Sequence, residues 1–285
     1  MNIFNVINEN YPKMSKGHKK IAEYILRNYD KAAFMTAARL GETVGISEST
    51  VVRFASELGF DGYPDLLQSL NEAVRKKLTS VQRIEVAATQ LGDEDVLEKV
   101  LNFDIERIRA TLESCSHEEF AKAVDAIISA RKIYIIGSRS AETLARFLSY
   151  YLNLMFENVK LLYTMGASEL LQQMFHVNEN DVVIGVSFPR YSKQTAKALE
   201  YASGMSASVI AITDSATSPI AENADCILQA KSDMVSFVDS LVAPLSLINA
   251  LIVAISIKKR DIVNENFARL ESIWDKYDVY EKSDD

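Results

Sequence analysis

The segment SFPRYSKQT, from Ser187 to Thr195, carries side chains that could hold an anion. It follows the β-branched run DVVIGV and precedes a stretch of helical character. The hydroxyls of Ser187, Ser192 and Thr195 can donate hydrogen bonds, and the N–H groups at a helix start favour negative charge. Arg190 adds a guanidinium that can donate two parallel hydrogen bonds. The pattern predicts a phosphate-type site and leaves open whether the anion reacts or is only sensed. The alternative is that Ser192 is a simple helix N-cap and Arg190 a solvated loop residue.

A loop of the same kind lies earlier in the chain and begins at Gly137, in the sequence GSRSAETLARF. We name this loop the first anion loop and the segment 187–195 the second anion loop. The first anion loop also lies between a β-rich run and a helical stretch, so Ser138, Arg139 and Ser140 are further candidates for anion contacts. The loop lacks the glycine pattern of a dinucleotide-binding loop, so we do not expect a nicotinamide cofactor. No cofactor of any other kind is predicted.

Groups that could carry catalysis are scarce. A sugar-phosphate isomerase needs a general base, usually Glu or His. The three histidines are His18, His117 and His176, and none lies in a recognisable catalytic pattern. No metal-ligand spacing and no nucleophile motif is present either. The sequence therefore predicts no catalytic residues and no metal, with a sugar-phosphate isomerase or lyase kept as an alternative.

Alternating β-rich and helical stretches predict the fold of residues 116–285. Five short β-rich runs are separated by helices: KIYIIG, VKLLY, DVVIGVS, ASVIAIT and ADCILQ. This order is typical of a five-stranded parallel α/β sandwich with helices on both faces, here closed by long helices at about 236–259 and 261–277. Ser218 and Pro219 predict a further helix start. Ligands of such sheets bind beyond the carboxyl ends of the strands, where both anion loops fall.

The first 80 residues show helical periodicity and no convincing strand. The stretch TAARLGETVGISESTVVRFASELGF predicts two short helices joined by a tight turn, with Gly45 ending the first and Ser47 capping the second. One face of the second helix is apolar, while Ser49, Thr50 and Arg53 occupy the other. Such a helix can enter a DNA major groove, where Arg can bind guanine. An ordinary surface helix is the alternative.

Charge and composition support a division into three parts. We expect a helix-turn-helix domain at residues 1–80, a helical linker at 81–115 and the α/β domain at 116–285. The net charge is −8, but Lys and Arg outnumber Asp and Glu in the first 80 residues, so DNA binding by this part stays possible.

The sequence also favours a cytoplasmic protein without a membrane segment. Only two cysteines are present, and the N-terminus does not resemble a signal peptide. The most apolar run, 241–257, contains Pro, Ser and Asn and is shorter than the ~20 residues that span a bilayer. A buried or interface helix is therefore expected there.

With these motifs in view, the chain resembles the RpiR family of bacterial transcriptional regulators, which join a helix-turn-helix domain to a SIS (sugar isomerase) domain. The resemblance covers essentially the whole chain and is carried by GISESTVVRFASELGFDGYPDL, IYIIG, DVVIGVS, VIAITDSATSPIAENAD and DKYDVY. It implies DNA contacts from Ser47, Ser49, Thr50 and Arg53 to a palindromic operator. It also implies a phosphosugar effector and a homodimer or homotetramer.

The anion loops depart from the family pattern. The phosphate loop of SIS domains resembles S-x-S-G-x-T, which Ser192 and Thr195 match, while Lys193 replaces the Gly. The first loop resembles G-x-G-x-S, in which Arg139 replaces the second Gly. Arg139 and Arg190 together indicate an effector with more negative charge than a sugar phosphate, such as a phosphorylated sugar acid. The competing interpretation is that the site is lost and the SIS domain serves only oligomerisation.

Overall fold

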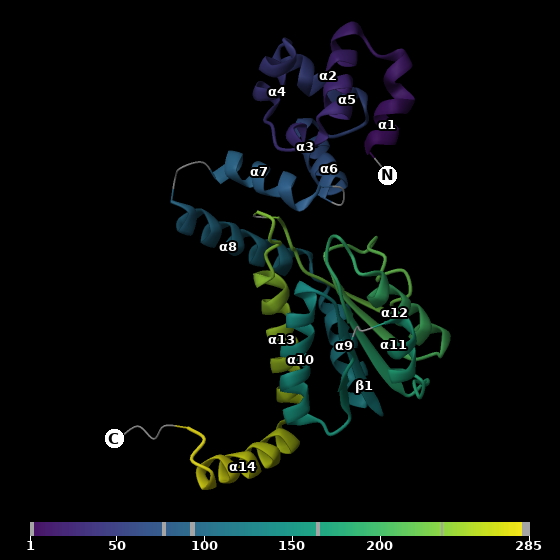
Figure 1. Ribbon diagram of the computed structural model, residues 1–285, viewed down its shortest axis with the longest axis vertical. Helices are drawn as coiled ribbons and strands as arrows, with labels where there is room; N and C mark the ends of the chain where they lie inside the picture. The colour runs from purple at the N-terminus through teal and green to yellow at the C-terminus, as the bar shows by residue number, and fades with distance from the viewer. Residues whose placement is uncertain (1–2, 76–77, 92–94, 164–165, 235, 281–285) are drawn as a thin grey trace. The chain divides into compact units, whose positions relative to one another are not determined.

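The computed structural model describes residues 3–75, 78–91, 95–163, 166–234 and 236–280 (Figure 1). The chain forms two compact units. The helical unit comprises Met1–Val100 together with Met234–Asp239, and the α/β unit comprises Leu101–Asp233 and Ser240–Asp285.

The helical unit contains α1 (Ile3–Asn10), α2 (Lys16–Arg27), α3 (Tyr29–Ala32), α4 (Ala37–Val44), α5 (Glu48–Glu57), α6 (Tyr63–Arg75) and α7 (Ser80–Leu91), with a 3-10 turn at Tyr11–Lys13. The predicted apolar face of α5 lies in its core, where Val51, Phe54 and Ala55 are fully buried. Gly45 ends α4 in a left-handed conformation, with φ of 68°. The predicted helix, turn and helix are therefore present.

The loop 234–239 belongs to the helical unit although it lies between a strand and a helix of the α/β unit in the sequence. Met234 joins the helical core, and an antiparallel bridge to Asp239 folds the loop back on itself. Arg83 of α7 is 1% exposed and donates a 2.8 Å hydrogen bond from Nη1 to Oδ1 of Asp239. A buried ion pair thus fixes this loop in the helical unit.

The α/β unit has one parallel sheet of five strands in the order β2-β1-β3-β4-β5. The strands are β1 (Lys132–Gly137), β2 (Val159–Leu161), β3 (Asp181–Val186), β4 (Ser208–Thr213) and β5 (Cys226–Gln229). The helices are α8 (Val96–Ser114, whose first five residues fall in the helical unit), α9 (His117–Ser129), α10 (Ser140–Met155), α11 (Ala167–Gln173), α12 (Lys193–Gly204), α13 (Val242–Lys258) and α14 (Arg260–Lys276). The predicted fold is confirmed.

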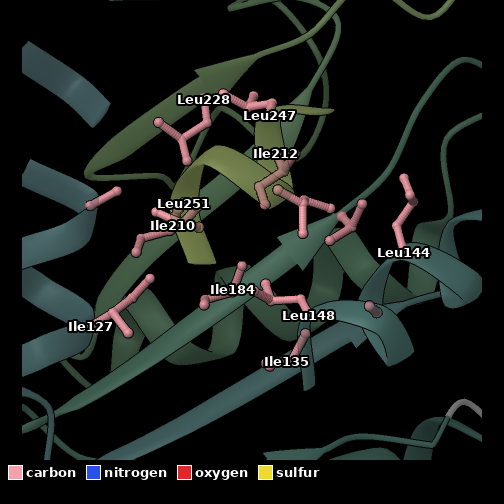
Figure 2. Packing of buried hydrophobic residues seen from close by; sticks show 14 of the residues in the cluster. Ile127, Ile135, Leu144, Leu148, Ile184, Ile210, Ile212, Leu228, Leu247 and Leu251 are labelled. Atoms are coloured by element: carbon pink, nitrogen blue, oxygen red, sulfur yellow. The ribbon is translucent and has the colours of Figure 1, made fainter. Parts of the chain in front are cut away.

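Helices cover both faces of this sheet because its central strands, β1, β3 and β4, are apolar on both sides. On one face, Ile135, Ile184 and Ile210 pack against α9, α10 and α13 (Figure 2). On the other face, Tyr134 and Val183 pack against α11 and α12. Both faces of the sheet are therefore covered by helices, and the loops begin at the ends of buried strands.

Two sequence-based element boundaries are wrong. The penultimate long helix begins at Val242 rather than near residue 236, because the preceding loop is folded into the helical unit. Pro219 does not begin a helix, and residues 216–223 form successive turns instead. Ser218 there is 2% exposed.

No single helix in the described part of the chain has the length and hydropathy of a membrane span. Helices α13 and α14 meet those criteria only when taken as a pair, and they are bent by 98° relative to each other.

Candidate functional site

The strand order has one switch point, where connections from neighbouring strands leave in opposite directions. From β1 the chain moves outward to β2, then crosses to β3 on the other side of β1. Loops at such a switch point diverge and leave an opening beyond the carboxyl ends of the two strands. The loop after β1, which begins at Ser138, and the loop 187–192 after β3 both start there.

Four hydroxyl groups from these loops and from α12 form one hydrogen-bonded network, which we name the hydroxyl cluster: Ser138, Ser187, Ser192 and Thr195. Ser192 Oγ donates to Ser138 Oγ at 3.0 Å, and Ser138 Oγ lies 3.3 Å from Thr195 Oγ1. The Ser192 N–H donates to Ser187 Oγ at 3.1 Å, and the Thr195 N–H donates to Ser192 Oγ at 3.2 Å. Ser192 is the N-cap of α12, as its position in the sequence predicts.

The hydroxyl cluster has the chemistry of an anion site. Its members can turn their O–H groups from one another toward an incoming oxyanion, and the start of α12 favours negative charge. Ser187 and Thr195 are almost fully buried, whereas Ser138 and Ser192 are half-buried and can reach a ligand.

Gly137 holds the first anion loop against its own helix. A Cβ atom at this position would lie 2.5 Å from the backbone oxygen of Ala141 and 3.0 Å from Cβ of Ala145. Only a glycine allows β1 to turn so closely into α10. Ser138, the next residue, lies beside α12, with its Oγ 3.3 Å from Thr195 Oγ1.

Arg139 and Arg190 both have a backbone conformation that favours glycine. Arg139 has φ of 58° and ψ of −128°, and Arg190 has φ of 66°. Both side chains are exposed. Such conformations cost free energy in residues with a Cβ atom and concentrate at functional sites. Ser140 begins α10, and among the hydrogen bonds of the described residues none joins its side chain to the hydroxyl cluster.

Replacing Arg139 with Gly should stabilise the α/β unit by about 1 kcal/mol, because relief of the strained backbone exceeds the entropic cost of glycine. Urea unfolding of the full chain measures this difference. Arg139→Ala is the control, since alanine removes the charge but keeps the strain. A glycine variant no more stable than the alanine variant would contradict the strain assignment.

Tyr191 is a site residue that the sequence did not single out. Its hydroxyl donates a 2.8 Å hydrogen bond to Oδ1 of Asp214, which also accepts from Thr213 Oγ1 at 3.3 Å. The second anion loop is thereby tied to the loop after β4. No spacing rule predicts this pair, because the two residues are distant in the sequence.

The candidate DNA-binding residues gather at the start of α5. Ser47 Oγ lies 3.0 Å from Ser49 Oγ and 2.9 Å from Thr50 Oγ1, and Arg53 Nη2 donates to Thr50 Oγ1 at 3.4 Å. Ser47, Ser49 and Arg53 are exposed. Ser47 holds the N-cap position, but its side chain makes no capping hydrogen bond because it is turned to its two hydroxyl neighbours. The four side chains form one polar surface at the start of α5, the second helix of the helix, turn and helix.

The described residues contain no group of three or more His, Cys, Asp or Glu side chains that could hold a metal ion. His18 is 8% exposed, stacks edge-on against Phe54, and its Nδ1 lies 2.6 Å from Oε2 of Glu57. This histidine therefore joins α2 to α5 in the helical core.

Both units match known families. The model of the rpiR-family helix-turn-helix domain matches residues 1–77, and the SIS domain model matches residues 126–254. The HTH-type transcriptional regulator HexR of Escherichia coli (strain K12) is 27% identical over 282 residues, which are 95% of this chain and 93% of that protein.

Solved structures agree with these matches. The sugar isomerase domain of an RpiR transcription factor from Sphaerobacter thermophilus has a TM-score of 0.60 and 27% identity, covering 63% of this chain and 99% of that one. NanR of Vibrio vulnificus, solved in complex with ManNAc-6P, has a TM-score of 0.58 and 20% identity, covering 95% of this chain and 99% of that one.

Fold, motifs and matches define a transcriptional regulator made of a helix-turn-helix domain and a SIS domain. The regulator names of the relatives favour this class over an enzyme. The chain belongs to the RpiR family.

Proposed function

We propose that this regulator binds operator DNA through α5 and senses a phosphorylated sugar or sugar acid at the hydroxyl cluster. The observation that carries the proposal is the cluster itself, with four hydroxyls at the switch point of the sheet and at the start of α12. Arg139 and Arg190 are exposed, have strained backbone conformations and lie next to members of the hydroxyl cluster in the sequence. Two guanidinium groups favour a ligand with more than one negative group. NanR, a protein of the same fold, was solved with a sugar phosphate.

The proposal includes the assembly and the division of the chain. A homodimer or homotetramer would present two α5 helices to half-sites about 34 Å apart, so the operator would be a palindrome. We also keep two predictions from the sequence. The chain is divided into a helix-turn-helix domain at 1–80, a helical linker at 81–115 and an α/β domain at 116–285, and the protein is cytoplasmic. Ligand binding would then change operator affinity by a coupling of typically ~1–3 kcal/mol.

Thermal unfolding of the full chain with a panel of sugar phosphates and phosphorylated sugar acids tests the effector site. Ligand at 100 times its Kd should add ~2.7 kcal/mol to the free energy of unfolding. Arg190→Ala should abolish that shift and leave ligand-free DNA affinity unchanged, because Arg190 belongs to the α/β unit. Loss of DNA binding in this variant would contradict its role as an effector contact.

The alternatives give different outcomes in the same experiment. A domain that serves only oligomerisation predicts no shift with any compound in the panel. A sugar-phosphate isomerase or lyase predicts that the stabilising compound is consumed, which chromatography of the incubated ligand detects.

Arg53→Ala should weaken binding to the operator by roughly 1–3 kcal/mol per site, because a guanidinium that binds a base edge is lost. The operator is first selected from random duplexes with the wild-type chain, and affinities are then measured by fluorescence anisotropy. Binding to unrelated duplexes should change much less. Equal losses on operator and unrelated DNA would contradict base recognition by Arg53.

A further inference from the structure

The first turns of α2 carry an unusual arrangement of charge. After the N-cap Ser15 the helix begins Lys16-Gly17-His18-Lys19-Lys20, with no acidic residue in the first turn. Lysines near the start of a helix oppose the helix dipole. Lys16 and Lys20 are also four residues apart, so their like charges lie on the same face and repel each other.

Neither lysine has a counter-ion among the residues that the structure describes. Lys16 and Lys20 are exposed, and within the described ranges no hydrogen bond or ion pair involves either ammonium group. By contrast, Lys19 lies over the ring of Tyr11, 5.5 Å from its centroid. Local arrangements that cost stability without an internal benefit are typical of functional surfaces.

This end of α2 lies beside the DNA-binding face of α5. A Cβ atom on Gly17 would stand 3.6 Å from Cγ2 of Thr50 and 3.7 Å from Cδ1 of Ile46. Lys16 adjoins Gly17, and Lys20 lies one turn further along on the same face as Lys16. Thr50 in turn contacts Ser47 and Arg53. The unpaired charges therefore flank the polar surface of the recognition helix.

We infer that Lys16 and Lys20 bind the phosphate backbone of duplex DNA next to the groove that α5 enters. This inference rests on the proposed function and adds a second contact surface to it. Phosphate contacts position a protein on DNA without reading its sequence. The division of roles is then clear, since Arg53 would select the site and the two lysines would supply salt-dependent affinity.

The salt dependence of binding tests the inference. The probe is a labelled duplex of random sequence, titrated with the full chain by anisotropy over a series of sodium chloride concentrations. Each phosphate contact contributes about −0.9 to the slope of log K against log salt. The variant Lys16→Gln/Lys20→Gln should therefore lose about 1.8 from the magnitude of that slope. The variant Lys16→Arg/Lys20→Arg should keep it.

Arg27→Gln/Lys31→Gln is the matched control. This control variant removes the same amount of charge as the glutamine variant. Arg27 ends α2, roughly 16 Å along the helix from Lys16, and Lys31 lies in α3. Both control residues are exposed. We expect its slope to equal that of the wild-type chain, so that loss of net charge alone does not explain the result.

The outcomes separate the two proposals. If the wild-type chain fails to bind duplex DNA, the proposed function is wrong and the inference falls with it. If the wild-type chain binds and the Lys16→Gln/Lys20→Gln slope equals the control slope, the inference alone is overturned. Thermal unfolding checks the fold of each variant, and the glutamine variant should unfold no earlier than wild type because it relieves repulsion in α2.

Discussion

Replacing Asp239 with Ala is expected to destabilise the helical unit by about 3–5 kcal/mol, although Asp239 lies far outside the first 100 residues. The carboxylate is the partner of Arg83, whose side chain is 1% exposed. Removing it leaves a charged guanidinium buried with one fewer anionic partner, which costs far more than a surface ion pair contributes. Urea unfolding with hydrogen exchange at amides of α5 and α7 reports on this unit.

Glu271→Ala is the control for Asp239→Ala, since it removes an exposed carboxylate from α14. The double variant Arg83→Met/Asp239→Leu should recover most of the loss, because no buried charge is then left behind. A cost for Asp239→Ala no larger than that for Glu271→Ala would show that the pair does not stabilise the helical unit.

Gly137→Ala is expected to destabilise the α/β unit by about 3 kcal/mol. The added methyl group would lie 2.5 Å from the backbone oxygen of Ala141, and a backbone atom inside a packed helix cannot move aside as a flexible side chain can. The first anion loop must then shift, which separates Ser138 from Ser192 and should also remove any ligand-induced rise in unfolding temperature.

Gly204→Ala is the matched control for this substitution. Apart from its chain neighbours and the backbone of its own helix, no atom of the described residues lies within 4 Å of a Cβ atom built on Gly204, the last residue of α12. Alanine favours helix more than glycine does, so this variant should be neutral or slightly more stable. Equal effects of the two substitutions would contradict the tight turn at Gly137.

The sequence predicts the sheet well because buried parallel strands leave a strong local pattern. Each of the five β-rich runs becomes a strand, since runs such as DVVIGV bury every residue. The start of α13 is predicted poorly because the local pattern does not show that the preceding loop belongs to another unit of the chain. Met234 joins the helical core, and residues 234–239 are assigned to the helical unit.

The candidate site shows the same contrast between local and distant interactions. Ser192 as the N-cap of α12 follows from local sequence, and its hydroxyl accepts from the Thr195 N–H as that position requires. The hydrogen bond between Ser192 and Ser138 joins residues 54 positions apart and depends on the strand order. The turned side chain of Ser47 likewise depends on competition between neighbouring hydroxyls, which residue types alone do not decide.

The 234–239 loop limits how this regulator can be cut and recombined. Because the chain enters the helical unit twice, that unit is not a contiguous module, and a chimaera joining residues 1–100 to a foreign SIS domain would lack Met234 and Asp239. Such a hybrid would lack the side chain of Met234 in the helical core, and the buried guanidinium of Arg83 would have one fewer anionic partner. Transplanting the helical unit into another regulator therefore requires two segments of this chain, the first 100 residues and the 234–239 loop between β5 and α13.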